Sequence, residues 1–184
     1  MPRHGFVIPA DVGLANGIRR SLLSDLENWA PCSLTIRVNT SCQTDEYIAH
    51  RIGLIPFRRI GNGDEMTLVQ TGGIVCADAT KGCAFEAVHP GLPIMDLGDD
   101  ATLDLVIHFD KQKASVHARY STCAAVGMHR VDDGRHKITF ELHDPLVNAS
   151  EVMMRAIQSL EARVDDCLLQ ISHQPDPPPK SRCG

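Results

Sequence analysis

The sequence is poor in aromatic residues and in net basic charge. Aromatic residues make up 4% of its 184 residues, and Trp29 is its only tryptophan. Proteins that bind single-stranded nucleic acid stack the bases on aromatic side chains, so this composition argues against that role. The 18 Lys and Arg residues are outnumbered by 23 Asp and Glu, which gives a formal net charge of −5. Such a surface is not that of an autonomous DNA- or RNA-binding protein.

Long apolar runs and paired cysteines are also lacking. No run approaches the roughly 20 apolar residues of a membrane-spanning helix, and the first four residues lack the apolar core of a signal peptide. We therefore expect an intracellular protein. The cysteines are odd in number and contain no CxxC pair, so we expect small buried side chains and a free thiol near the end rather than a disulfide scaffold. They are Cys32, Cys42, Cys76, Cys83, Cys123, Cys167 and Cys183.

Motifs for catalysis, metal binding or phosphate binding are lacking too. The glycines form neither GxGxxG nor GxxxxGK[ST], so a phosphate-binding loop is not indicated. The spacing of Cys76 and Cys83 is not that of a structural zinc site, and His117 has no family signature of a cysteine nucleophile around it. We expect no catalytic residue, metal or cofactor. The alternative that stays open is a small thiol- or metal-dependent enzyme using Cys76, Cys83 or His117.

What the sequence does contain is the pattern of a globular protein, with 43% hydrophobic and 22% charged residues. An apolar residue recurs at every fourth position at Leu14, Ile18, Leu22 and Leu26, which predicts a helix over residues 14–29. Asp11 is placed to cap its start, and a proline two residues beyond the range marks its expected end. Gly17 costs about 1 kcal/mol relative to Ala inside a helix, so either another backbone passes close by or the glycine is merely tolerated.

A strand and a short helix are predicted next. Apolar residues alternate with polar ones over residues 34–38, as on a half-buried strand. Thr44 precedes two acidic residues and has the position of a helix cap, while Gly53 has that of a C-cap. From Arg58 to Ser121 the chain offers short β-like runs at 66–69, 74–77 and 103–109, separated by glycine-rich turns. This part reads as a small, mainly β domain inserted into the chain.

The C-terminal part carries a strand and the most regular pattern of the sequence. Residues 136–143 alternate as a one-sided strand. Asn148 with Glu151 resembles a capping box, and the helix it opens is predicted to run to Ile171. Its seam residues are spaced 4, 3, 4, 3, 4, which is a heptad repeat, although an ordinary core helix also shows such a stripe. They are Met153, Ile157, Leu160, Val164, Cys167 and Ile171. Residues 173–184 contain four prolines and are predicted to be a disordered tail.

Three segments resemble one known family. They are L-A-N-G-I-R-R at 14–20, N-T-S at 39–41 and D-E-Y-I-A-H-R-I-G-L-I-P at 45–56. Together they resemble the assembly subunit of multisubunit DNA-directed RNA polymerases, in its archaeal D and eukaryotic third-largest-subunit branch. H-A-R-Y-S at 117–121 is similar to a further family segment, although Thr122 stands where proline is usual. The resemblance extends over most of residues 6–171, and the short chain is compatible with a large DNA virus.

The resemblance implies an α+β fold with a split domain. A helix-and-antiparallel-sheet dimerisation domain would comprise residues 1–57 and 122–172, the inserted domain residues 58–121, and the tail residues 173–184. The chain would be a non-catalytic scaffold subunit that forms a heterodimer with a smaller alpha-like subunit and docks large catalytic subunits. A bacterial-like homodimer is the alternative within the family. No metal is implied, because the cysteine cluster of some relatives is lacking. The location would be the nucleus or cytoplasm of a host, or a virion if the protein is viral.

The resemblance also implies two sets of site residues. The dimer interface would be formed by Leu14, Ile18, Leu22, Leu26, Met153, Ile157, Leu160, Val164, Cys167 and Ile171. The docking surface for a large subunit would be formed by Asn16, Arg19, Arg20, Asp45, Glu46, His50, Arg51 and Gly53. Arginines suit such a surface because they make bidentate contacts with partly desolvated partners.

Overall fold

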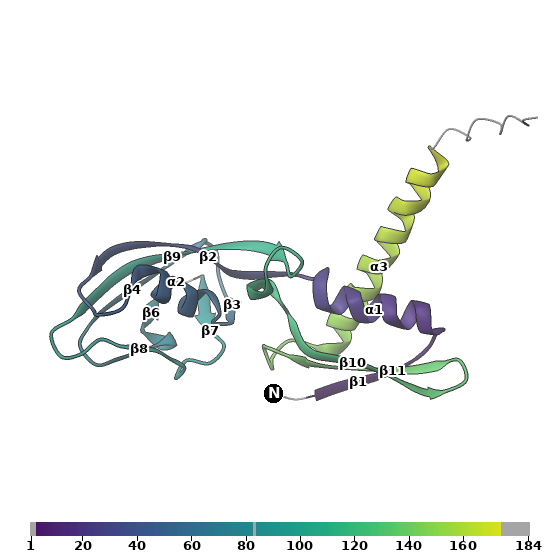
Figure 1. Cartoon of the computed structure of the whole chain (residues 1–184), viewed down its shortest axis with the longest axis horizontal. Coiled ribbons are helices and arrows are strands. Elements are labelled where there is room, and N and C mark those ends of the chain that lie inside the picture. The colour runs from purple at the N-terminus through teal and green to yellow at the C-terminus, as the bar shows by residue number, and fades with distance from the viewer. Residues whose placement is uncertain (1–2, 83, 174–184) are drawn as a thin grey trace, which may run out of the picture.

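Two hydrophobic clusters divide the structure into two lobes, which lie one beside the other along the long axis in Figure 1. The computed structural model describes residues 3–82 and 84–173. We call residues 27–120 the sheet lobe, and residues 3–26 with 121–173 the helix lobe. The fold is a mixed α+β arrangement in which every strand pair is antiparallel.

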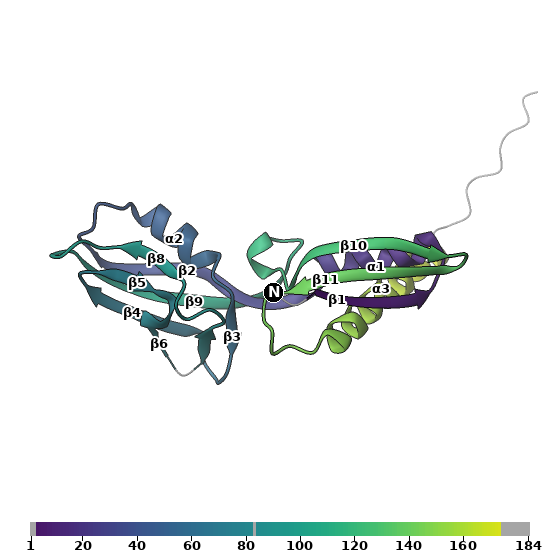
Figure 2. The same cartoon turned by 90° about the horizontal axis from the view of Figure 1, so that it is seen from below.

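The helix lobe consists of one three-stranded sheet and two helices. Strands β1 (Arg3–Pro9), β11 (Arg135–Leu142) and β10 (Cys123–Asp132) form the sheet in that order. Helices α1 (Val12–Ser24) and α3 (Ala149–Ser172) lie together on one side of it, as Figure 2 shows. Their apolar faces meet Ile138, Phe140 and Leu142 of β11 in one buried cluster. This lobe therefore contains both the N-terminal and the C-terminal segments of the described chain.

The sheet lobe is built on two long strands. Strand β2 (Glu27–Asn39) pairs with β9 (Thr102–Lys113), and β4 (Glu65–Thr71) and β6 (Thr80–Lys81) complete a four-stranded sheet. Helix α2 (Asp45–Gly53), the pair β3 (Phe57–Arg59) and β7 (Phe85–Ala87), and the pair β5 (Ile74–Cys76) and β8 (Pro93–Asp96) pack around it. Short 3₁₀ helices lie at η1 (Ala77–Ala79) and η2 (Ala118–Tyr120).

The core of the sheet lobe is closed around stacked aromatic rings. Phe85 and Phe109 stack with their ring centroids 4.0 Å apart, and Phe57 meets Phe109 edge to face at 5.1 Å. The guanidinium of Arg59 lies 4.0 Å from the ring centroid of Trp29, so this cation covers the rim of the cluster. Four of the eight aromatic residues of the chain thus lie in this one cluster.

The predicted helix starts are confirmed. Asp11 accepts a hydrogen bond from the backbone N–H of Leu14 at 2.8 Å, and Thr44 accepts one from Tyr47 at 3.3 Å. Asn148 caps α3, but its side chain accepts from Ser150 N rather than from Glu151 N as in a capping box. Caps of this kind depend on residues two or three positions apart, so the sequence displays them directly.

The predicted ends are less accurate. The first helix stops at Ser24 with Asp25 as its C-cap, and Trp29 lies in β2, so the prediction of a helix to residue 29 is wrong. The ladder with β9 already begins at Glu27, and Pro31 lies at an irregularity of that ladder, where its missing N–H is tolerated. Gly53 is the last residue of α2, and Leu54 is the C-cap in its place.

Packing does not follow the predicted boundary after residue 57. Ile48, Ile52 and Phe57 lie in the same cluster as Leu103 and the other buried residues of β9. The break between the two clusters instead falls just before β2, while the return near residue 122 agrees with Cys123 being buried in the helix lobe. The division of the chain into domains stays a prediction, and the packing moves its first boundary toward residue 27. Most of the predicted tail, residues 174–184, lies outside the described residues.

Candidate subunit interface

Helices α1 and α3 cross at Gly17. A Cβ atom on Gly17 would lie 3.0 Å from Cδ2 of Leu160, which is closer than most real contacts. Of the two explanations offered for Gly17, a close approach by another segment is therefore confirmed over a merely tolerated glycine. The neighbour is a side chain of the chain's own α3, however, not another backbone. The glycine lets the two helices cross tightly within one subunit.

Two arginines hold α3 against the end of α1. Arg155 Nη2 donates to the carbonyl oxygen of Glu27 at 3.0 Å, and Arg163 Nη1 donates to Asp25 Oδ2 at 2.6 Å. Asp25 also accepts hydrogen bonds from Ser21 and Ser24. Burial raises the pKa of Asp25, but the bonds from Ser24, Arg163 and Ser21 outweigh it, so its pKa is lowered and the carboxylate stays charged.

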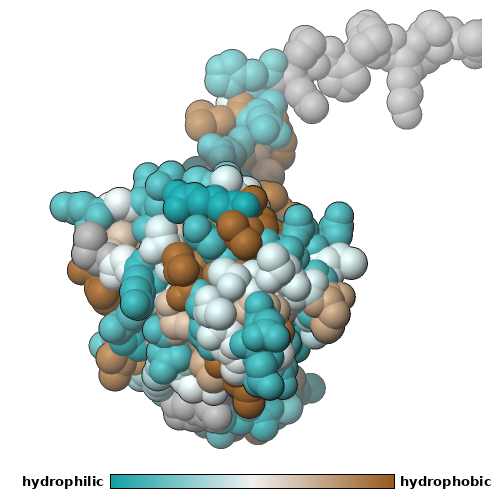
Figure 3. Space-filling model, turned by 90° about the vertical axis from the view of Figure 1, so that its left-hand side faces the viewer, coloured by the Kyte–Doolittle hydropathy of each residue, from teal (hydrophilic) through white to brown (hydrophobic). Residues whose placement is uncertain are grey.

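Beyond this crossing, the side-chain bond of Arg163 to Asp25 is the last one that ties α3 to another element among the described residues. Every residue from Glu161 to His173 is exposed, and Figure 1 shows this part of the helix standing away from both lobes. Val164, Leu168 and Ile171 are 50%, 58% and 65% exposed. In the end-on view of Figure 3, the protruding segment carries apolar side chains next to hydrophilic ones. We call Glu161–His173 the free arm.

An apolar groove lies where the free arm leaves α1. Leu14 and Gly17 line it from α1, and Ile157, Leu160 and Val164 line it from α3. Its volume is about 380 Å³, and Glu161 and Asp165 stand at its edge. Grooves of this kind between two helices accept the apolar face of a third helix. The groove and the free arm together form one continuous surface.

The ten predicted interface residues fall into three groups. Ile18, Leu22, Leu26 and Met153 are buried in the chain's own core, and of these only Ile18 also lines the groove. Ile157 and Leu160 are half-buried beneath the α1 crossing. Leu14, Val164, Cys167 and Ile171 are exposed. Leu168, which is not in the predicted set, is also exposed on the free arm.

The predicted docking residues of α1 lie beside the groove-forming turns. Asn16 Oδ1 accepts a hydrogen bond from Nε of Arg19 at 3.0 Å, which fixes the guanidinium along the helix. Arg20 is exposed, and no hydrogen bond or ion pair of its side chain is found within the described part of the chain. One arginine is therefore oriented and the other is available to a partner.

The predicted docking residues of α2 divide into structural and exposed ones. Arg51 donates from Nε to the carbonyl oxygen of Ile94 at 3.1 Å and from Nη2 to that of Pro93 at 2.8 Å, so it fastens α2 to β8. Asp45 accepts from the side-chain amide of Asn39 at 2.8 Å. Gly53 is buried. Glu46 and His50 are exposed, and no hydrogen bond or ion pair of their side chains is found among the described residues.

The segment 117–121 works as a structural joint. Arg119 Nη1 donates to the carbonyl oxygen of Pro31 at 2.8 Å. The same guanidinium packs against Gly53, where an added Cβ atom would lie 3.5 Å from Nη1. His117 Nδ1 accepts from the backbone N–H of Arg119 at 3.1 Å and from its Nε at 3.2 Å. The motif therefore ties the end of α2 to β2 at the point where the chain returns to the helix lobe.

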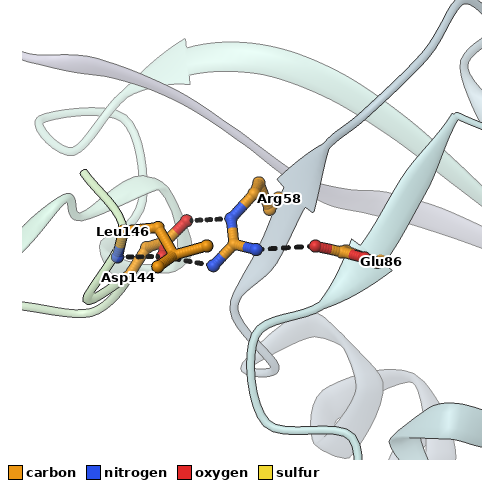
Figure 4. A network of polar contacts seen from close by, with 4 residues as sticks. All are labelled: Arg58, Glu86, Asp144 and Leu146. Carbon is orange, nitrogen blue, oxygen red and sulfur yellow. Dashed lines mark hydrogen bonds and ion pairs between the residues drawn. The ribbon is translucent and has the colours of Figure 1, made fainter.

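A second joint connects the lobes through Arg58, as Figure 4 shows. Its Nε and Nη2 donate to the two oxygens of Asp144 at 2.6 and 2.5 Å, and its Nη1 donates to Glu86 at 2.6 Å. Asp144 also accepts from the backbone N–H of Leu146. The bonds from Arg58 lower the pKa of Asp144, and Asp144 raises the pKa of Arg58. Sequence reasoning missed this pair, whose members are 86 residues apart.

The positions of Cys76 and His117 do not support the alternative of a thiol- or metal-dependent enzyme. Within residues 3–82 and 84–173 no group of three His, Cys, Asp or Glu residues is placed to hold a metal ion. His117 is engaged by Arg119, Cys76 is part of β5, and Cys83 lies outside the described residues. No helix in the described ranges is long and apolar enough to cross a membrane.

Comparison with known proteins finds several subunits of DNA-directed RNA polymerases. The DNA-directed RNA polymerase subunit Rpo3 of Methanocaldococcus jannaschii is 26% identical over 172 residues, which are 90% of this chain and 88% of that protein. Rpo3 of Natronomonas pharaonis is 29% identical over 71% of this chain and 58% of its own length. Subunit 3 of the DNA-directed RNA polymerases II, IV and V of Arabidopsis thaliana is 48% identical over 46 residues, 25% of this chain and 14% of that protein.

These relatives define the class of protein. No family model matches the chain. The chain nevertheless spans most of one archaeal relative, and less than two thirds of the other two. The class is that of the assembly subunits of multisubunit RNA polymerases, as the motifs at 14–20 and 45–56 indicated. Within it, the chain is a homologue of archaeal Rpo3 and of eukaryotic third-largest-type subunits, at 25–29% identity where the match covers most of the chain.

Proposed function

We propose that this chain, a non-catalytic assembly subunit of a DNA-directed RNA polymerase, pairs with a smaller alpha-like subunit through α1 and α3. The single observation that carries the pairing is the apolar groove continued by the bare free arm. Burying a Val, Leu or Ile side chain stabilises a complex by about 1.5–3 kcal/mol. Association that buries several such residues of the free arm is therefore strongly favoured.

The proposed pairing surface consists of the exposed residues of the predicted set and of the floor of the groove. Leu14, Val164, Cys167 and Ile171 remain accessible, and Leu168 joins them. Ile157 and Leu160 form the floor of the groove. The partner's helix would lie across α1 and along the free arm, so that a bundle of four helices forms across the two subunits.

We further propose that the large catalytic subunits dock on exposed groups of both lobes. Arg20 projects from α1 in the helix lobe, and Glu46 and His50 project from α2 in the sheet lobe. A large subunit that contacts both groups spans the Arg58 joint between the lobes. The structural contacts of Arg51 and Asp45 would keep α2 in a fixed position for this docking.

Co-expression tests the pairing. The chain is produced with the smaller alpha-like subunit of its own genome, and the mass of the complex is measured by native mass spectrometry. We expect a one-to-one heterodimer that Leu168→Asp disrupts. Val69→Asp is the matched control, because Val69 is 59% exposed on β4 of the sheet lobe. A folded chain that stays monomeric with every candidate partner would refute the pairing.

Charge reversal tests the docking. Arg19→Glu with Arg20→Glu should leave the heterodimer intact and weaken the recovery of large subunits in a pull-down. Lys137→Glu, an exposed residue of β11, is the control for a charge change in the same lobe. Unchanged recovery of the large subunits would remove α1 from the docking surface.

An intracellular location belongs to the same proposal, because such a subunit works where its polymerase works. The expectation of a viral origin or of packaging in a virion has no support among the relatives, which are archaeal and eukaryotic proteins.

A further inference from the structure

We propose that acidic side chains at the edge of the groove select the partner: its helix carries Lys or Arg beside an apolar stripe, and a second copy of this chain is barred. The inference rests on the proposed function and adds the chemistry of the partner. It concerns Glu161, Asp165 and Asp166, which none of the predicted interface or docking sets included.

The α3 side of the groove is charged with one sign. Glu161 and Asp165 line its edge, and Asp166 follows on the free arm. Arg163 is the one Lys or Arg between residues 156 and 173, and its guanidinium is paired with Asp25 at 2.6 Å. The α1 residues of the groove carry no charge. An apolar floor with an acidic edge therefore faces any incoming helix.

This arrangement discriminates against self-association. In a two-fold symmetric dimer the same patch of both subunits forms the interface, so each residue meets its own counterpart or a neighbour of it. The free arm that entered the groove of a second copy would bring Asp165 and Asp166 to a rim formed by Glu161 and Asp165. Like charges brought together in a partly desolvated interface oppose association.

The same arrangement favours a basic partner helix. Glu161 and Asp165 are four residues apart, so they lie one turn from each other on the same face of α3. A helix packed along the free arm would meet them with residues spaced by one turn. Lys or Arg at those positions would form ion pairs at the rim, while the apolar stripe beside them fills the groove.

Self-association of the full chain is the first measurement. Sedimentation equilibrium is compared for the wild type and for Glu161→Gln with Asp165→Asn, which remove the charges and keep the shapes. We expect a monomeric wild type and a variant that self-associates at least about tenfold more tightly at low salt. Asp99→Asn with Asp100→Asn, at exposed positions of the sheet lobe, is the control and should stay monomeric. A dimeric wild type, or a variant no tighter than the wild type, would overturn the exclusion of a second copy.

Binding of two synthetic helices is the second measurement. Both peptides carry the same apolar heptad stripe; one has Lys and the other Glu at the positions flanking the stripe. Fluorescence anisotropy should show the Lys peptide binding the wild-type chain at least about tenfold more tightly, and Glu161→Lys with Asp165→Lys should invert the preference. Circular dichroism confirms that the variants are folded. Equal binding of the two peptides, or binding of neither, would overturn the proposal.

The outcome is separable from that of the proposed function. If the smaller alpha-like subunit pairs equally well with the wild type and with the charge-reversed chain, the acidic selection is wrong and the pairing stands. If that subunit pairs with neither while the chain is folded, the pairing itself is wrong.

Discussion

The sheet lobe and the helix lobe differ in how completely they bury their apolar residues. In the sheet lobe, α2 and two short strand pairs close over the four-stranded sheet, and the rings of Phe57, Phe85 and Phe109 lie inside. In the helix lobe, the sheet is covered by α1 and the first half of α3, while the free arm remains bare. The first lobe buries its apolar residues within the chain, whereas the second leaves an apolar stripe exposed to solvent.

The difference begins within a single helix. Val152, Met153 and Ala156 of α3 are almost fully buried, whereas Val164, Leu168 and Ile171 are exposed by half or more. The heptad spacing is the same on both sides of Leu160. Periodicity therefore identifies the apolar stripe, and the crossing with α1 decides which part of the stripe is buried and which part is exposed.

The largest expected contrast is in thiol reactivity. Burial raises the pKa of Cys123 to about 12, whereas Cys167 is exposed on the free arm. The attacking species is the thiolate, so Cys123 should react with a disulfide reagent on the order of a thousandfold more slowly than a free cysteine. Stopped-flow labelling of the native chain checks this, with Cys167→Ser as the control that removes one fast phase. Fast labelling at Cys123 would show that the helix lobe opens.

A large truncation in the closed core should cost the most stability. Phe85→Ala removes a ring that is 1% exposed and stacked on Phe109, and we expect a loss of about 3–5 kcal/mol in the free energy of unfolding. Urea denaturation of the chain measures it. A loss below about 1 kcal/mol would mean that the sheet lobe is not the well-packed unit described above.

The joint between the lobes should have an intermediate effect that depends on pH. Asp144→Asn removes the charge that Arg58 meets, and we expect a loss of about 1–3 kcal/mol at pH 7. Because the folded pKa of Asp144 lies below its usual value of 3.8, the stabilisation is present above that pH and is lost as the pH falls through the folded pKa. The free energies of unfolding of the wild type and of Asp144→Asn should therefore become equal in acid, as urea denaturation at several pH values would measure.

The control for this joint is an exposed ion pair. Asp133→Asn breaks the ion pair between Asp133, which is 93% exposed, and Arg130, which is 68% exposed. This change should lower the free energy of unfolding by less than about 0.5 kcal/mol. Equal losses for Asp144→Asn and Asp133→Asn would contradict a stabilising contact between the lobes.

The smallest effect is expected on the free arm of the isolated chain. Leu168→Ser removes an exposed side chain without a neighbour, so the free energy of unfolding should change by no more than about 0.5 kcal/mol. Thermal unfolding of the chain without a partner measures it. A loss of 2 kcal/mol or more, in the range of a core truncation, would show that the arm packs within the monomer.

Much of the local structure could be predicted from the sequence. The caps at Asp11, Thr44 and Asn148, the strands around 34–38 and 136–143, and the long last helix follow from periods and neighbours a few residues apart. The extension of β2 back to Glu27 could not be predicted in this way. It depends on Lys113, with which Glu27 pairs across the ladder.

The candidate site could be predicted only in part. The stripe from Met153 to Ile171 is visible in the sequence, as are the arginines of α1. That Arg51 is engaged with Pro93 and Ile94, and that Arg163 is engaged with Asp25, depends on groups far away along the chain. Spacing shows which residues share a face of a helix, but not what covers that face.

The sequence by itself determined the family, through two motifs in the first 56 residues, and it determined the helices and their starts, because these depend on short-range hydrogen bonds and apolar periods. Only the tertiary structure decided where α3 stops being core and becomes a free arm. The physical reason is the crossing of α1 and α3 at Gly17 and Leu160, two residues far apart in the chain. Beyond this crossing α1 no longer covers the apolar stripe of α3.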